Sequence, residues 1–148
     1  MPKRCTFSII IPVLHEADII TTLLDSLRQL EWDEPFEIIV VDGSTTQDTL
    51  QVIADTSVLK YACPQGRGRQ MNEGAAHATG EILVFLHADT FLPPNALSLI
   101  HSTLENKRYV GGAFTLQIQS HISFLRAIAA YSTLRSQISH APYGDQVI

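Results

Sequence analysis

The sequence predicts an α/β fold: a mostly parallel sheet with helices on both faces. Short runs of β-branched residues alternate with segments of helical periodicity, and repeated strand–helix–strand units place strands in parallel through right-handed crossovers. The runs are almost continuously apolar, which is typical of strands covered on both faces. The length of 148 residues fits one domain, so we expect a single domain over residues 1–148. The order of the strands in the sheet does not follow from the sequence.

The first half of the chain predicts three strands and two helices. Apolar runs predict strands over residues 7–13, 36–41 and 57–62. A stripe of leucine and isoleucine at three- and four-residue spacing predicts a helix over residues 17–31. Ser44 with Gln47, or Thr45 with Asp48, has the spacing of a capping box, which predicts a helix from this point to about residue 54.

The second half continues the alternation. A loop over residues 64–68 precedes a helix over 69–79, for which Gly80 is the expected C-terminal cap, and a fourth strand follows over 81–86. Two prolines at 93–94 suit the start of a helix that runs to about residue 106. Residues 109–118 predict a less buried strand, bent at Gly111–Gly112, and residues 121–139 predict a helix.

Composition narrows the class of protein. The net charge of −5 argues against a partner such as nucleic acid, which needs a basic surface. Cys5 and Cys63 lie far apart and form no metal or redox motif, so we expect two reduced thiols. No apolar run is long enough for a transmembrane segment and no signal peptide is evident. We therefore expect a cytoplasmic protein, with peripheral membrane association left open.

Polar residues follow each predicted strand. His15 and Glu16 follow the first strand, Asp42 the second, Arg67 and Arg69 lie after the third, and His87 and Asp89 follow the fourth. Ligands of open α/β sheets bind outside the carboxyl ends of the strands, so these groups share one rim. A carboxylate can hold a divalent cation, and arginines at a helix N-terminus bind anionic oxygens. The combination suggests a nucleoside diphosphate and its metal.

Each of these groups also has a plainer interpretation. Asp42 and Asp89 could be turn residues, Arg67 and Arg69 could be solvated surface charges, and the histidines could be ordinary surface or core residues. Only the coincidence of acids after two strands with arginines after a third favours a site. The sequence contains no P-loop, no glycine-rich dinucleotide fingerprint after the first strand and no nucleophile elbow.

Three segments resemble the opening motifs of family 2 glycosyltransferases with the GT-A fold, a Rossmann-like fold that binds nucleotide-diphosphate sugars. They are residues 8–16 (SIIIPVLHE), 38–44 (IIVVDGS) and 83–89 (LVFLHAD). Residues 66–72 (GRGRQMN) and 111–114 (GGAF) are most similar to a bacterial subgroup associated with radical-SAM and selenium proteins. The resemblance covers essentially the whole chain.

The resemblance implies a role for individual residues. The segment from Pro12 to Glu16 would line the base and ribose pocket, and Asp42 would contact the nucleobase. Arg67 and Arg69 would lie near the nucleotide. Asp89 matches the last aspartate of the family's D-x-D metal motif, which implies Mg²⁺ or Mn²⁺. His87 replaces the first aspartate of that motif and is a second candidate ligand.

The resemblance also leaves the catalytic base unassigned. Such enzymes continue further and carry a later acidic motif, whereas this sequence stops at Ile148, and Asp145 is its only downstream candidate base. We expect a C-terminally incomplete GT-A domain that lacks much of the acceptor half. The expected function is an inverting, metal-dependent sugar transfer from a nucleotide-diphosphate donor to an unknown acceptor. A catalytically inert donor-binding fragment, a homo-oligomer whose second copy completes the site, and a nucleotidyltransferase remain the alternatives.

Overall fold

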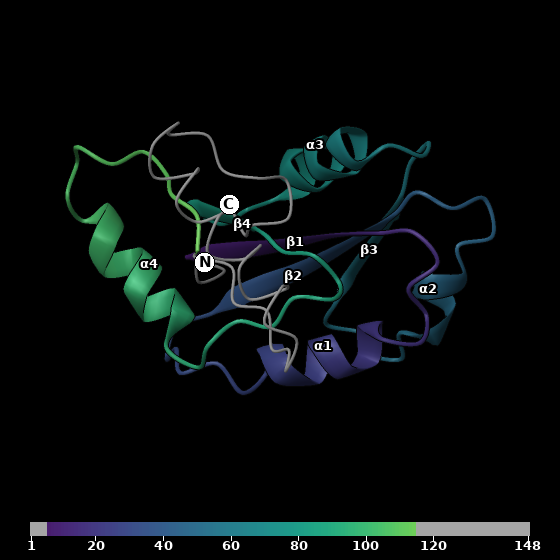
Figure 1. Cartoon of the computed structure of the whole chain (residues 1–148), viewed down its shortest axis with the longest axis horizontal. Coiled ribbons are helices and arrows are strands. Elements are labelled where there is room, and N and C mark those ends of the chain that lie inside the picture. The colour runs from purple at the N-terminus through teal and green to yellow at the C-terminus, as the bar shows by residue number, and fades with distance from the viewer. Residues whose placement is uncertain (1–5, 115–148) are drawn as a thin grey trace, which may run out of the picture. The chain divides into compact units, whose positions relative to one another are not determined.

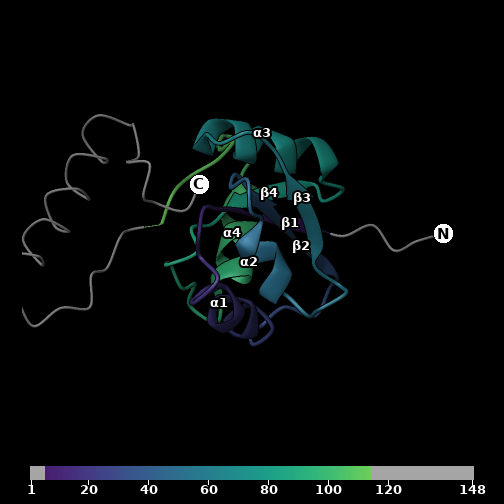
Figure 2. The ribbon, with the colours of Figure 1, turned by 90° about the vertical axis from the view of Figure 1, so that its right-hand side faces the viewer.

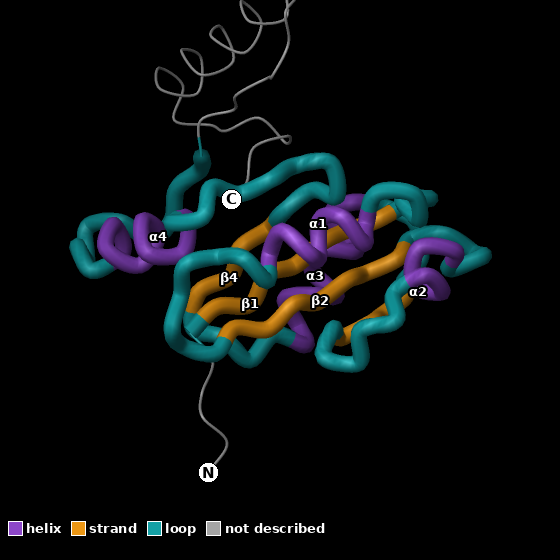
Figure 3. Tube along the Cα trace, turned by 90° about the horizontal axis from the view of Figure 1, so that it is seen from below, coloured by secondary structure: helices purple, strands orange, loops and turns teal. Residues whose placement is uncertain are grey.

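Four parallel strands form one sheet in the computed structural model, which describes residues 6–114 (Figure 1). In chain order they are β1 (Phe7–Val13), β2 (Phe36–Asp42), β3 (Leu59–Ala62) and β4 (Ile82–Phe85). Their order in the sheet is β3-β2-β1-β4, so β1 and β2 are central. Figure 3 shows β1 running between β4 and β2. The first four of the five predicted strands are confirmed, and the observed bounds of each lie within two residues of the predicted bounds.

Helices cover both faces of this sheet, as expected from strands that are apolar along their whole length. They are α1 (Ile20–Leu27), α2 (Asp48–Val52), α3 (Arg67–His77) and α4 (Ala96–Leu104). Figure 2 shows α3 on one face and α1 on the opposite face. The α/β class with a parallel sheet is therefore confirmed. Among residues 6–114, no helix has the length and apolar character that a membrane span requires.

The sheet and its helices belong to a compact unit that ends at Tyr109, and a second unit begins at Val110. Residues 110–114 of the second unit are described and contain neither helix nor strand. The predicted strand over 109–118 is therefore not found over 109–114. Its remainder, the predicted helix over 121–139 and Asp145 lie outside the described residues.

The core on the α3 face depends on a close approach between helix and sheet. Ile10 and Val41 are fully buried there. A Cβ atom at Gly74 of α3 would lie only 2.4 Å from the Cγ2 atom of Ile10. Glycine at this position thus brings the helix backbone close to β1 and β2, and so fixes where the first turn of α3 meets the carboxyl ends of the strands.

Gly80 has a different role from the predicted helix cap. The residue after α3, Ala78, has an extended backbone, and Gly80 does not adopt the left-handed conformation of a glycine cap. A Cβ atom at Gly80 would instead lie 2.6 Å from the backbone of Phe7 and Ser8. The prediction of a cap was wrong because Gly80 is needed for close contact with β1, which local sequence does not reveal.

The amino-terminal edge of the sheet is held by Glu37. Its carboxylate accepts hydrogen bonds from the Ser8 hydroxyl at 2.5 Å and from the Thr79 backbone N–H at 2.6 Å. Burial acts to raise the pKa of Glu37, but these hydrogen bonds outweigh burial and the pKa is lowered. The group joins β1, β2 and the turn before β4 at the edge opposite the predicted site.

Pro12 lies where the β1–β4 ladder has already ended. The last residue of β4, Phe85, is opposite Ile10, and the Ile10 carbonyl accepts the Leu86 N–H at 2.9 Å. Alternate residues of a strand bond to the same neighbour, so Pro12 also faces the β4 side. Its missing N–H therefore leaves no partner unsatisfied in β4, which is the condition under which proline is tolerated in a strand.

Helix α2 begins later than predicted. The capping spacing places its start near Ser44, but the helix starts at Asp48, because Gln47 has a left-handed backbone with φ of 51°. The Ser44 hydroxyl does accept the Gln47 N–H, at 2.9 Å, as its spacing predicts. Ser44, one of the two predicted caps, therefore makes the expected bond, but this bond closes a turn; the residue before α2 is Gln47, which makes no side-chain cap bond.

Candidate functional site

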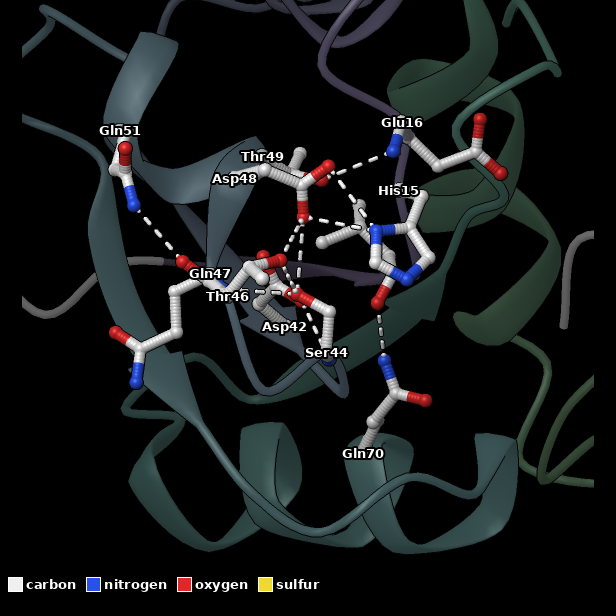
Figure 4. A network of polar contacts seen from close by, with 11 residues as sticks. His15, Glu16, Asp42, Ser44, Thr46, Gln47, Asp48, Thr49, Gln51 and Gln70 are labelled. Atoms are coloured by element: carbon white, nitrogen blue, oxygen red, sulfur yellow. Dashed lines mark hydrogen bonds and ion pairs between the residues drawn. The ribbon is translucent and has the colours of Figure 1, made fainter.

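The candidate site lies at the carboxyl ends of β1 and β2, where two loops exchange hydrogen bonds. Figure 4 shows these contacts, which run from the buried Asp42 through Ser44 and Asp48 to His15. Because β1 and β2 are the central strands, their loops lie between the loops that follow β3 and β4. This position is the one at which open α/β sheets bind their ligands.

Asp42 ends β2 and is completely buried. Its Oδ1 atom accepts the Ser44 N–H at 2.7 Å. Its Oδ2 atom is buried and has no hydrogen-bond partner among the described residues. A buried polar atom without a partner costs a protein free energy, and such atoms are rare in folded domains. Asp42 therefore has a buried acceptor atom that the described part of the chain does not use.

Asp48 is the centre of the exposed part of the network. Its carboxylate accepts hydrogen bonds from the hydroxyls of Ser44 and Thr46, both at 3.0 Å, and both its oxygens lie 3.1 Å from Nδ1 of His15. These bonds, chiefly the one from His15, lower the pKa of Asp48 to about 2. Asp48 is thus an acceptor throughout the neutral range and orients the side chains around it.

His15 is held in an uncommon backbone conformation just after β1. Its φ is 59°, in the left-handed region that residues other than glycine seldom occupy. Because the Asp48 carboxylate only accepts, Nδ1 of His15 donates and carries a proton. The imidazole is 61% exposed. The contact with Asp48 thus fixes the orientation of the ring on the rim.

The segment from Pro12 to Glu16 lies at the same rim as Asp42. The backbone N–H of Glu16 donates to the hydroxyl of the buried Thr49 at 2.9 Å, so the end of β1 is fixed to α2. The carboxylate of Glu16 points away from this network (Figure 4). Pro12 is half-buried within β1, opposite Val41.

The arginines predicted near the nucleotide lie in the first turn of α3, and the predicted metal ligands lie in the loop after β4. Arg67 is the first residue of α3, and its guanidinium contacts Nδ1 of His87 beyond β4. A guanidinium only donates, so Nδ1 of His87 is the acceptor. Asp89 lies two residues further and is exposed, and Arg69 is exposed in the first turn of α3. The structure therefore brings Arg67 and His87 together, with Arg69 in the same turn of α3 as Arg67 and Asp89 in the same loop as His87.

The exposed carboxylate of Asp89 is the predicted metal ligand on this rim. Residues 6–114 contain no group of three or more histidine, cysteine or acidic side chains arranged to hold a metal. Mg²⁺ at phosphate sites is, however, often held by one or two carboxylates together with phosphate oxygens. The exposed Asp89 fits such a site, whereas Nδ1 of His87 is already engaged by Arg67.

Three side chains of this region were not predicted as site residues. The sequence singles out Ser44 and Asp48 only by their capping spacing, and Gln70 only as part of the segment over residues 66–72. The Gln70 amide donates to the carbonyls that end β1 and β2. A further signal for Gln70 is that it is a polar residue one turn before Gly74, on the same face of the helix. Cys63, at the end of β3, is a free thiol whose pKa is raised by burial, and Cys5 lies outside the described residues.

Comparison with other sequences shows that this chain is similar to a known family of proteins. The family model described as "Glycosyl transferase family 2" matches residues 8–138. A PGL/p-HBAD biosynthesis glycosyltransferase of Mycobacterium tuberculosis is 36% identical over 93 residues, which are 58% of this chain and 36% of that protein. A probable glycosyltransferase of Sulfolobus acidocaldarius is 34% identical over 101 residues, 61% of this chain and 22% of that protein. The chain thus spans little more than a third of these relatives at most.

Solved structures show the same fold. The mannosyltransferase PcManGT from Pyrobaculum calidifontis, in complex with GDP-Man and Mn²⁺, superimposes with a TM-score of 0.69 and 23% identity, over 99% of this chain and 44% of that one. Glucosyl-3-phosphoglycerate synthase from Mycobacterium tuberculosis, with Mn²⁺ and UDP, gives a TM-score of 0.63 at 21% identity, over 97% of this chain and 56% of that one. Because the family model covers most of the sequence and the fold agrees, this chain belongs to glycosyl transferase family 2.

Proposed function

We propose that this chain is the donor-binding part of a glycosyltransferase, which takes a sugar from a nucleotide-diphosphate donor and transfers it to an acceptor. The buried Oδ2 atom of Asp42 is the observation that carries the proposal. An acceptor at this depth suits an N–H group of a nucleobase, such as N3–H of uracil or N1–H of guanine. The relatives named as glycosyltransferases and the neighbours bound to UDP or GDP-Man support the assignment.

In this proposal, the other rim residues contact different parts of the donor. Pro12 and Glu16 line the nucleoside, and Arg67 and Arg69 donate to the diphosphate. Asp89 would hold Mg²⁺ or Mn²⁺. His87, which contacts Arg67, would lie close to the donor. When bound, the divalent ion supplies Lewis-acid stabilisation of the leaving diphosphate. We propose an inverting transfer, and the similarity to the radical-SAM- and selenium-associated subgroup remains a prediction.

Titration of UDP and GDP with the folded protein tests donor binding, with and without Mn²⁺. We expect one of the two nucleotides to bind and Asp42→Asn to weaken it. The matched control is Asp33→Asn, the same substitution at an exposed position just before β2, at the other edge of the sheet. The proposal is wrong if neither nucleotide binds, or if both substitutions have the same effect.

A second measurement separates an enzyme from a donor-binding fragment. Release of UDP or GDP from a matching nucleotide sugar, with water or an added sugar as acceptor, would report transfer. Binding without release at any protein concentration would favour the inert fragment, because the residues described include no assigned base. Release that rises with the square of protein concentration would favour a homo-oligomer in which a second copy completes the site. Release of pyrophosphate from a nucleoside triphosphate would favour a nucleotidyltransferase.

A further inference from the structure

Gln70 is a buried polar side chain on the face of α3 that covers the sheet. It is 4% exposed, and it lies one turn before Gly74, where the helix approaches the strands closely. A buried amide needs partners for its two N–H groups, because leaving them unpaired is costly. Leucine or alanine would pack at such a position without that requirement, so packing alone does not account for a glutamine here.

Both N–H groups of Gln70 bind main-chain carbonyls of other elements. Its Nε2 atom lies 2.7 Å from the Val13 carbonyl, which ends β1, and 2.9 Å from the Val41 carbonyl in β2. The Val13 carbonyl also accepts the Gly43 N–H at 3.0 Å. One side chain therefore holds the carboxyl ends of the two central strands to α3, on the side of the network seen in Figure 4.

The backbone after β2 is fitted to this amide. A Cβ atom at Gly43 would lie 2.8 Å from both Cδ and Oε1 of Gln70. Gly43 does not have a positive φ, so its lack of a side chain matters here for the close contact with Gln70 rather than for backbone conformation. Asp42 thus stands between Val41 and Gly43, and both of these neighbours contact Gln70.

The same residue fixes the other side of the candidate site. Gln70 lies one turn after Arg67 in α3, and its backbone N–H donates to the Gly66 carbonyl at 2.9 Å. The Arg67 guanidinium contacts His87 beyond β4. The hydrogen bonds of the Gln70 side-chain amide therefore set the position of Arg67 relative to Asp42, because one turn of helix joins the two residues of α3.

We propose that Gln70 is a positioning residue for donor binding, which holds the buried acceptor of Asp42 and the guanidinium of Arg67 at the separation that a nucleoside diphosphate requires. This inference rests on the proposed function. Gln70 does not touch the donor and acts through Asp42 and Arg67. A residue that merely stabilises the fold would instead lower the folded population and leave the affinity of the folded protein unchanged.

The test compares two glutamine-to-methionine substitutions. Gln70→Met keeps the length and buried volume but removes both donors. The control is Gln51→Met, which removes a similar bond, from an exposed amide to the Thr46 carbonyl at 2.8 Å. We expect the affinity for UDP or GDP with Mn²⁺, measured by calorimetry on protein shown to be folded, to fall on the order of tenfold for Gln70→Met. For Gln51→Met we expect it to stay within about twofold, because that bond is exposed.

A double-mutant cycle with Asp42→Asn gives the readout that a structural role would not move. If Gln70 acts through Asp42, Gln70→Met weakens binding much less in the Asp42→Asn background than in the wild-type background. If the two losses multiply, or if Gln70→Met binds as the wild type does, the inference is overturned. Should Gln70→Met not fold, Gly43→Ala displaces the same amide by steric contact and is expected to give the same loss and the same cycle. Absence of binding by the wild type would refute the proposed function instead, so the two failures are distinguishable.

Discussion

Replacing Asp42 by asparagine tests two effects of its carboxyl group separately: its effect on the stability of the free protein and its effect on the affinity for a nucleotide. Asparagine has the same shape, and its oxygen can keep the bond from the Ser44 N–H, which is 2.7 Å long. The substitution then places an NH₂ group where the unpartnered Oδ2 atom was. An N–H group of a nucleobase would meet a donor in place of an acceptor.

The expected loss of affinity follows from the burial of this atom. Asp42 is 0% exposed, so water cannot replace the lost acceptor. Hydrogen bonds to charged groups contribute about 1.5–3 kcal/mol, which corresponds to a Kd that rises by roughly 10- to 150-fold. The free protein loses no hydrogen bond, so its free energy of unfolding should stay within about 1 kcal/mol of the wild-type value or rise.

Calorimetry and urea unfolding measure the two quantities on the same samples. A nucleotide methylated at the pairing nitrogen, 3-methyl-UDP or 1-methyl-GDP, supplies the complementary change on the ligand. It should bind the wild type as weakly as the unmodified nucleotide binds Asp42→Asn, and the substitution should then have little further effect. The reasoning is refuted if affinity is unchanged by the substitution, or if affinity falls only in proportion to lost stability.

Three further predictions concern neighbouring residues. Asp89→Ala should abolish the gain in nucleotide affinity that Mn²⁺ gives while leaving metal-free binding within about twofold, as titration with and without Mn²⁺ would show, because Asp89 is the proposed metal ligand. The pKa of Asp48 is lowered to about 2, so the stability from its contact with His15 is present above pH 4 and is lost as the pH falls toward 2. The urea midpoint should therefore fall more between pH 5 and pH 2 in the wild type than in Asp48→Asn; equal falls would contradict this. Gly74→Ala should reduce the free energy of unfolding by about 1–3 kcal/mol, because its Cβ would lie 2.4 Å from Ile10; an unchanged urea midpoint would show that α3 can shift.

The features that sequence predicts here are those with a local cause. The apolar run of β1 gives its bounds without error, and the Ser44 hydroxyl accepts the N–H that its spacing indicates. The rim position of Asp42 follows from its place directly after a buried strand. The left-handed backbone of Gln47, which delays the start of α2, has no such local signal.

Features that depend on distant contacts could not be predicted in this way. The carbonyl that Gln70 binds at the end of β1 is 57 residues away, and the strand order that brings them together is not encoded in any local pattern. Gly80 is a comparable case, since its contact is with Phe7 and Ser8 rather than with its own helix. In both cases the sequence shows a residue of uncommon type at its position, but the reason becomes visible only in three dimensions.

Pro12 affects the register in which β4 can pair with β1 during folding. A parallel strand can pair with β1 in several registers, and a shift by two residues preserves which side chains face the core. Sliding β4 two residues along β1 would bring its end opposite Pro12, where no N–H is available for the ladder. The proline therefore penalises the misaligned pairing and leaves the native one intact. One residue thus disfavours a shifted alignment of β4, and the pairing of β1 with β4 ends before the candidate site.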